Sequence, residues 1–233
     1  MNMPLQNNRL QNNRLQTTHP HRQIARCATA VLAALLGTNA WAATVFQENF
    51  DSDPLGPLDA NWTVTSAGAS TVGVVDSTDH GHVMRMFGSP TLGHYLIASR
   101  AFSSSALEIG TRADIRPSSG ASFLWILNGA GTSIGRRRIR LQLPPGSTVL
   151  EAQTVPSGTT RCGTLTRGVW SQVTLMVNAS ARRFDVLING RPTACTSIAA
   201  DIQPPFRSVS VMDASNEGWG GAVRFDNIQV ATP

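Results

Sequence analysis

The stretch that decides the fold is Gly168–Gly190, GVWSQVTLMVNASARRFDVLING. In Val169–Val177, every second side chain points to the same face of an extended chain, and one of the two faces is mostly apolar. Phe184–Ile188 alternates in the same way, and Asn178–Ser180 between the two runs favours a turn. Asn189-Gly190 then supplies two residues that tolerate positive φ, as a tight hairpin turn requires. The pattern predicts two antiparallel strands rather than a helix. They serve either as core scaffold or as part of a sugar-binding sheet.

Two further stretches extend this pattern toward the chain ends. Val45–Asp51 precedes Asn61–Val64 near one end, and Val223–Val230 lies near the other. Together with the central hairpin, and in this order, they resemble the strands of concanavalin-A-like and laminin-G-like β-sandwiches. The resemblance spans nearly all of the chain after residue 42. It implies an all-β fold, a two-sheet antiparallel jelly roll whose first and last strands lie side by side, and it does not by itself settle function.

Residues 1–42 have the features of a signal peptide with a long basic region. Four arginines and no acid precede the apolar run and the small residues Ala40-Trp41-Ala42, which have the spacing that signal peptidase reads. The apolar run Ala28–Leu36 is shorter than the roughly 20 residues that a membrane-spanning helix needs. We expect cleavage after Ala42, a single sandwich domain over 43–233, no membrane span after cleavage, and a secreted or periplasmic location.

Charge argues against nucleic acid as a partner. Four of the 19 basic residues lie in 1–42, and the remaining 15 oppose 14 acids. The part of the chain after residue 42 is therefore close to neutral, without the strong positive field that nucleic-acid binding requires.

The two cysteines beyond residue 42 are Cys162 and Cys195. An even number of cysteines in an exported chain predicts a disulfide, because oxidising compartments seldom leave such pairs reduced. We expect this bond to flank the central hairpin and clamp its open end. The alternative is a pair of free buried thiols.

Acids near the two chain ends suggest a structural cation. Glu48 lies between two aromatic residues on one strand face, where a carboxylate is costly unless it is paired or bound to a cation. The apolar parity of the last strand switches at Asp226-Asn227, which predicts a β-bulge. If the terminal strands meet, Glu48, Asp51 and Asp226 are candidate ligands for Ca²⁺. The alternative is a salt bridge to Arg224 or solvent exposure.

Two local patterns resemble metal motifs but lack part of them. Asp51–Gly56 begins like an EF-hand loop, but Trp62 stands where that loop needs a glutamate. His80-Gly81-His82 would place two imidazoles on one strand face, but no third zinc ligand follows at the usual spacing. Turns entering strands are expected at both places.

The sequence places its strongest candidates for ligand contacts in the middle of the chain. Arg136, Arg138 and Arg140 share one face of an expected strand, and Trp125 lies on the preceding one. If the two faces coincide, aromatic rings and guanidinium forks form a platform for sugars that carry acid groups. A shift of one residue in register would move Trp125 into the core and leave a solvated arginine face. Trp219, in a glycine-rich loop, either touches a ligand or caps the core edge.

Catalytic motifs are not recognisable. Glycoside hydrolases of family 16 on this fold carry Glu-x-Asp-x-x-Glu, whereas Gly110 and Ala113 follow Glu108 here. Asp114 lies about 20 Å along the strand from Glu108, too far for the roughly 5–9.5 Å between paired glycosidase carboxylates. Alginate-lyase motifs and Gly-x-Ser-x-Gly are also missing.

The sequence therefore favours a secreted, non-catalytic domain that binds carbohydrate, in particular an acidic polysaccharide or a cell-surface glycan. Two alternatives remain open: a glycoside hydrolase or polysaccharide lyase with an unrecognised site, and a structural or assembly protein of the cell surface. The candidate ligand contacts are Trp125, Arg136, Arg138 and Trp219, and the candidate cofactor is Ca²⁺.

Overall fold

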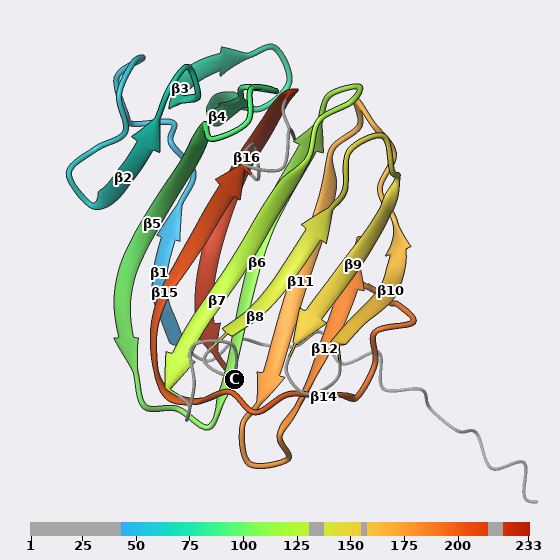
Figure 1. Cartoon of the computed structure of the whole chain (residues 1–233). Coiled ribbons are helices and arrows are strands. Elements are labelled where there is room, and N and C mark those ends of the chain that lie inside the picture. Colours follow the sequence, from blue (N-terminus) through green and yellow to red (C-terminus); the bar gives the residue numbers. More distant parts are fainter. Residues whose placement is uncertain (1–42, 131–137, 155–157, 214–220) are drawn as a thin grey trace, which may run out of the picture. The chain divides into compact units, whose positions relative to one another are not determined.

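The chain folds as two antiparallel β-sheets packed face to face (Figure 1). The computed structural model describes residues 43–130, 138–154, 158–213 and 221–233, and these residues contain no helix. The described residues therefore offer no helix that could cross a membrane. The all-β, two-sheet fold class predicted from the sequence is confirmed.

The nine-stranded sheet contains both the central hairpin and the two terminal strands. Its order is β13-β12-β11-β6-β16-β4-β3, with β1 paired to β16 and β14 paired to β12. Its strands are β1 (Ala43–Glu48), β3 (Thr71–Ser77), β4 (Gly81–Gly88), β6 (Glu108–Pro117), β11 (Ser171–Asn178), β12 (Arg183–Ile188), β13 (Arg191–Pro192), β14 (Ile198–Ala199) and β16 (Gly221–Thr232).

The seven-stranded sheet covers one face of the nine-stranded sheet. Its order is β10-β9-β8-β7-β15-β5-β2. Its strands are β2 (Trp62–Ala67), β5 (Tyr95–Ser104), β7 (Phe123–Ala130), β8 (Arg138–Leu143), β9 (Val149–Thr154), β10 (Gly158–Thr164) and β15 (Gln203–Asp213).

The central hairpin forms as predicted, with a turn that runs to Arg182. Asn178 pairs with Arg183, so four residues connect β11 and β12. The turn closes because the backbone N–H of Ala181 donates to Asn178 Oδ1 at 2.7 Å, and Arg182 adopts a φ of 53°. The second turn is as predicted: Asn189 and Gly190 have φ angles of 52° and 72°.

The two terminal strands lie side by side, as expected. β1 pairs antiparallel with β16, so that Phe46 is opposite Val230. The bulge expected at Asp226-Asn227 is also present, since the register of β16 against β6 shifts between Asp226 and Gln229. Asn227 absorbs the extra residue with a φ of 49°.

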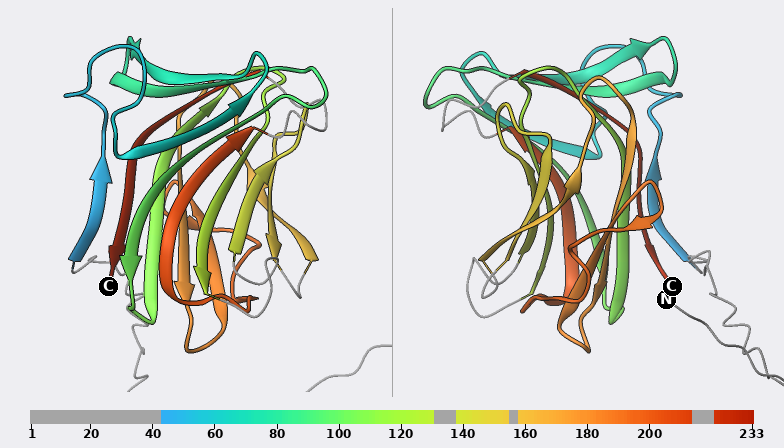
Figure 2. Two further views of the ribbon diagram at one scale, coloured as in Figure 1. Left: turned by 60° about the vertical axis from the view of Figure 1, so that its left-hand side comes forward. Right: turned by 90° about the vertical axis from the view of Figure 1, so that its right-hand side faces the viewer.

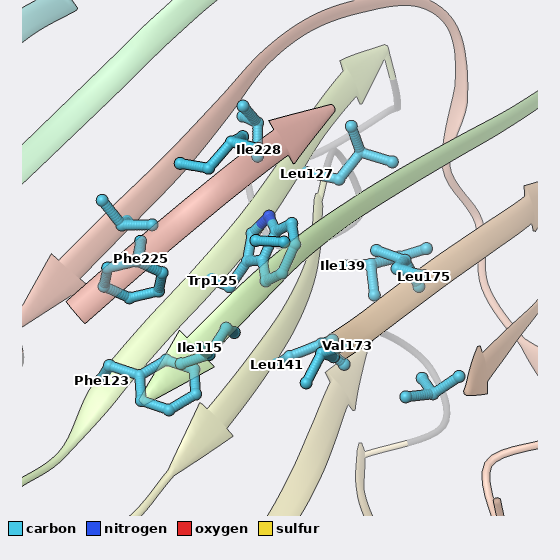
Figure 3. Packing of buried hydrophobic residues seen from close by; sticks show 14 of the residues in the cluster. Ile115, Phe123, Trp125, Leu127, Ile139, Leu141, Val173, Leu175, Phe225 and Ile228 are labelled. Carbon is cyan, nitrogen blue, oxygen red and sulfur yellow. The ribbon is translucent and has the colours of Figure 1, made fainter. Parts of the chain in front are cut away.

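Apolar side chains from both sheets fill the space between them (Figure 3). Phe123 and Trp125 project from β7 toward Ile115 of β6 and Phe225 of β16. The rings of Phe123 and Phe225 meet edge to face, with centroids 5.7 Å apart. Each of these four side chains is at most 1% exposed, so alternation along the strands directs the intervening residues to the two outer faces.

Cys162 and Cys195 form the predicted disulfide, but it does not clamp the open end of the hairpin. Cys162 lies on β10, at the edge of the seven-stranded sheet. Cys195 follows β13 and lies beside β12, where its carbonyl accepts the N–H of Val186 at 2.8 Å. The bond therefore joins the edges of the two sheets.

We expect replacement of both cysteines by alanine to lower the free energy of unfolding by about 3–4 kcal/mol, because the bond closes a long loop in the unfolded chain. Urea unfolding of the double variant and of the wild type, each with and without dithiothreitol, measures this. Equal midpoints for the oxidised wild type and the double variant would contradict it.

Candidate functional site

The outer face of the seven-stranded sheet is the first candidate site. The long strands of this sheet bow toward the other sheet, so that their outer face is concave (Figure 2). We call this outer face the concave face. Its side chains alternate with core residues along β5, β15, β7, β8 and β9, and most are partly exposed.

Small polar side chains cross the middle of the concave face. Ser99 of β5 and Ser210 of β15 lie opposite each other, with their hydroxyl oxygens 2.8 Å apart. The side-chain amide of Asn128 on β7 donates to Ser208 Oγ at 3.0 Å. These four residues, three of them serines, form a polar ladder across the sheet.

Two arginines border the polar ladder. Arg138 lies directly opposite Asn128, and Arg140 lies opposite Ile126. Both alternate with buried core residues of β8, so both belong to the concave face. Farther along β8, Gln142 donates to Glu151 of β9 at 2.9 Å. Glu151 supplies the one carboxylate on the described strands of this face.

An apolar cluster adjoins the same arginines. Leu124 and Ile126 of β7 point away from the main core and pack with Met212 of β15. Leu124 is 3% exposed and Ile126 is 7% exposed. The concave face therefore offers hydroxyl, amide and guanidinium groups beside an aliphatic cluster that is nearly buried.

Trp125 does not belong to the concave face, and its predicted role as a ligand contact is wrong. It lies opposite Leu141 and is 1% exposed, inside the core between the sheets. β7 is apolar on both of its faces, so its own sequence did not show which face is buried. The register against β8 places Trp125 with Leu141 and separates it from Arg138.

Two predicted contacts cannot be placed. Arg136 and Trp219 lie outside the residues that the structure describes, so their predicted roles stay predictions. Arg138 is the predicted contact that the structure does place on an outer face.

Three carboxylates come together near the start of the domain, but not the three that we expected. Among the described residues, Glu48, Asp53 and Asp59 have carboxylate oxygens within 4.8 Å of one another. Arg100 Nη1 lies 4.0 Å from Glu48 Oε2 and 3.7 Å from Asp59 Oδ1. Burial raises the pKa of Glu48, and the neighbouring charges of Asp53 and Asp59 raise it further.

A tight turn brings this acidic cluster together. Phe50 is completely buried and adopts a φ of 59°, a conformation uncommon for a bulky side chain. Its N–H donates to Glu48 Oε1 at 3.2 Å, and its carbonyl accepts the N–H of Asp53 at 2.9 Å. The chain therefore reverses directly after β1, which an alternating strand pattern does not reveal.

Asp51 and Asp226, the other two predicted calcium ligands, have different partners. The carboxylate of Asp51 packs over Gly81 and accepts the N–H of His82 at 3.3 Å. Asp226 lies 2.9 Å from Nδ1 of His80, and its side chain is 5% exposed. Burial raises the pKa of Asp226. The expectation that Glu48, Asp51 and Asp226 share one cation is therefore corrected.

The turn before β4 is attached to the outer face of the nine-stranded sheet. The ring of His80 stacks on Trp170, with centroids 4.1 Å apart, and the indole N–H of Trp170 donates to Asp79 at 3.1 Å. Arg116 of β6 also binds Asp79, at 3.2 Å. The hydrogen bonds from Ser77 and Trp170 lower the pKa of Asp79. Sequence reasoning missed this cluster because its members are far apart along the chain.

Comparison with known proteins places the fold but not a family. No protein-family model matches the sequence, and no curated protein matches it.

Similar solved structures are numerous. A sialidase matches with a TM-score of 0.62 at 14% identity over 81% of this chain, which corresponds to 18% of that longer chain. An endo-β-1,4-glucuronan lyase from Trichoderma reesei matches with a TM-score of 0.54 at 14% identity, over 82% of this chain and 96% of the lyase. The carbohydrate recognition domain of Emp47p matches with a TM-score of 0.53 at 9% identity, over 84% of this chain and 99% of that domain. Enzymes and binding domains both occur among these structures, and such low identity supports the fold alone. The described domain therefore has the fold of a concanavalin-A-like β-sandwich.

Proposed function

We propose that the protein binds an acidic polysaccharide on its concave face without cleaving it. The observation that carries this proposal is the position of Arg138 and Arg140 beside the polar ladder. A guanidinium group binds a carboxylate or sulfate with two parallel hydrogen bonds. Serine hydroxyls and the amide of Asn128 suit sugar hydroxyls.

The described strands of the concave face do not favour a glycosidase. Hydrolysis of a glycosidic bond normally needs two carboxylates facing one site. Glu151 is the carboxylate that these strands provide, and Gln142 is hydrogen-bonded to it. This supports binding over hydrolysis.

A polysaccharide lyase is the second candidate, and one residue favours it. Tyr95, the only tyrosine of the chain, alternates with core residues of β5 and therefore belongs to the concave face. A phenol can act as an acid–base group, while an arginine or an amide stabilises the charge on a uronate. Incubation with polyglucuronate separates the two candidates. Release of unsaturated uronate, detected by ultraviolet absorbance and lost in Tyr95→Phe, would replace the binding proposal.

We further propose that the protein is exported and acts on glycans outside the cytoplasm. The sequence features of residues 1–42 and the Cys162–Cys195 disulfide support this location.

A structural Ca²⁺ is proposed at the acidic cluster of Glu48, Asp53 and Asp59 rather than at the set chosen from the sequence. Calcium binds carboxylate oxygens. Oδ2 of Asp53 is buried and has no hydrogen-bond partner among the described residues, which suits a cation ligand. The guanidinium of Arg100 partly neutralises the cluster, so a bound ion would have to compete with it.

Replacement of Arg138 by glutamine is expected to weaken binding of polyglucuronate about tenfold, because one charge-assisted pair of hydrogen bonds is lost. Isothermal titration calorimetry at low and moderate salt measures this. Arg183→Gln is the matched control, because Arg183 is exposed on β12 in the other sheet. Equal affinity in wild type and Arg138→Gln would remove the concave site.

Calcium is expected to raise the thermal midpoint as its concentration increases, because a ligand that binds only the folded state stabilises it by mass action. The gain is about 2.7 kcal/mol at 100 times the dissociation constant. Differential scanning calorimetry in calcium, magnesium and EDTA measures this, and Asp53→Asn should abolish the effect. A midpoint that is the same in calcium and in EDTA would exclude a structural site.

Replacement of Glu48 by glutamine is expected to stabilise the fold in EDTA at neutral pH. Burial raises the pKa of Glu48 in the folded state, so stability is lost as the pH rises through that folded pKa, and glutamine avoids this loss. Well below the ordinary pKa of glutamate the two proteins should unfold alike. For a domain of this size, the thermal midpoint is expected to rise by about 2–4 °C for each kcal/mol gained in the free energy of unfolding. Glu108→Gln, at an exposed glutamate, is the control. A difference in thermal midpoint between Glu48→Gln and wild type that stays constant across pH would show that the raised pKa of Glu48 is not its cause.

A further inference from the structure

The outer face of the nine-stranded sheet carries three arginines in one line. Arg224 of β16 lies directly opposite Arg85 of β4 on one side and Arg116 of β6 on the other. Each alternates with core residues of its own strand, so all three point away from the core. We call Arg85, Arg224 and Arg116 the arginine row. It lies on the sheet opposite to the one that bears the concave face (Figure 1).

Like charges in direct register are unfavourable in a sheet. Directly opposite side chains have Cβ atoms about 4.5–5.5 Å apart, and like charges at that distance destabilise the pairing. The arginine row contains two such pairs in succession, Arg85–Arg224 and Arg224–Arg116. A bound anion would relieve both.

Neighbouring carboxylates do not neutralise the whole row. Asp79 binds Arg116 at 3.2 Å, at one end of the row. Asp226 and Asp114 lie on the same face, but His80 binds Asp226 at 2.9 Å and the side-chain amide of Asn227 donates to Asp114 at 2.9 Å. Among the described residues, the row therefore has three guanidinium groups and one carboxylate partner, Asp79, which binds Arg116.

The central arginine is the least satisfied of the three. Nε of Arg224 is buried and has no hydrogen-bond partner among the described residues. A buried donor without a partner is costly, and an oxyanion would supply one. Arg85 is exposed, and its guanidinium lies 5.7 Å from the centroid of the Phe87 ring, which leaves its N–H groups for a ligand.

An aromatic side chain lies beside each of the two outer arginines of the row. Phe87 is 37% exposed beside Arg85. At the other end, Ser171 pairs with Ile115, which places Trp170 beside Arg116. The stack on His80 and the hydrogen bond to Asp79 hold the indole in place. Guanidinium groups in a line, with aromatic rings beside them, suit a chain of sugars that carries acid groups.

We propose that the arginine row is a second binding site, specific for the oxyanion of an acidic glycan. The oxyanion is a uronate carboxylate or a sulfate ester, since both match the guanidinium fork. The near-neutral charge of the chain after residue 42 favours a local contact with a glycan over the broad field needed for nucleic acid. This site is independent of the concave face, because it lies on the other sheet.

The test is calorimetric titration of the full exported protein with two probes, polyglucuronate and dextran sulfate. Arg224→Gln and Arg85→Gln are each expected to weaken binding of at least one probe about tenfold and to remove one class of sites from the stoichiometry. Arg85 is exposed, so the second variant should keep its fold, which the thermal midpoint verifies. Weaker binding of polyglucuronate by these variants identifies the bound oxyanion as a carboxylate. Weaker binding of dextran sulfate alone identifies it as a sulfate.

Two controls separate this site from the concave face. Arg183→Gln removes an exposed arginine elsewhere on the same sheet and should bind like wild type. Arg138→Gln should leave the site at the arginine row intact even if the concave face does not bind. Wild-type affinity and stoichiometry for both probes in Arg224→Gln and Arg85→Gln would overturn the proposal. Tighter binding of duplex DNA of similar length, lost in the same two variants, would also overturn it.

Discussion

Packing of the two sheets against each other is the constraint on which the rest of the structure depends. Phe123 and Trp125 from one sheet meet Ile115 and Phe225 from the other, and all four are almost completely buried. Because side chains alternate along a strand, burying one face of each strand directs every other residue to an outer face of the sandwich. The positions of the arginines, serines and amides on the two outer faces follow from this core.

The two outer faces differ in chemistry. The concave face has small hydroxyl groups at its centre, with Arg138 and Arg140 at one side. The opposite face has arginines in direct register, with their acidic neighbours largely engaged by His80 and Asn227. All 19 basic residues of the chain are arginines, and arginine binds planar oxyanions with two hydrogen bonds where lysine presents a single point charge.

Backbone turns account for the acidic groups near the chain ends. The left-handed conformation of Phe50 reverses the chain and brings Asp53 to Glu48, while Asp51 is directed toward Gly81. The bulge at Asp226-Asn227, by contrast, was visible in the sequence as a change of apolar parity. A parity change can be read along one strand, but a single residue at positive φ leaves no such pattern.

The sequence by itself determined the two strands of the central hairpin, the Asn189-Gly190 turn, the bulge at Asp226-Asn227 and the disulfide. Each of these depends on local periodicity, on turn chemistry or on the number of cysteines. Only the tertiary structure decided which face of β7 is buried, and therefore that Trp125 is a core residue. It also brought together Glu48 with Asp59, His80 with Asp226, and the three arginines of the row. These contacts depend on strand order and register, which arise from packing between distant segments and cannot be read from a single strand.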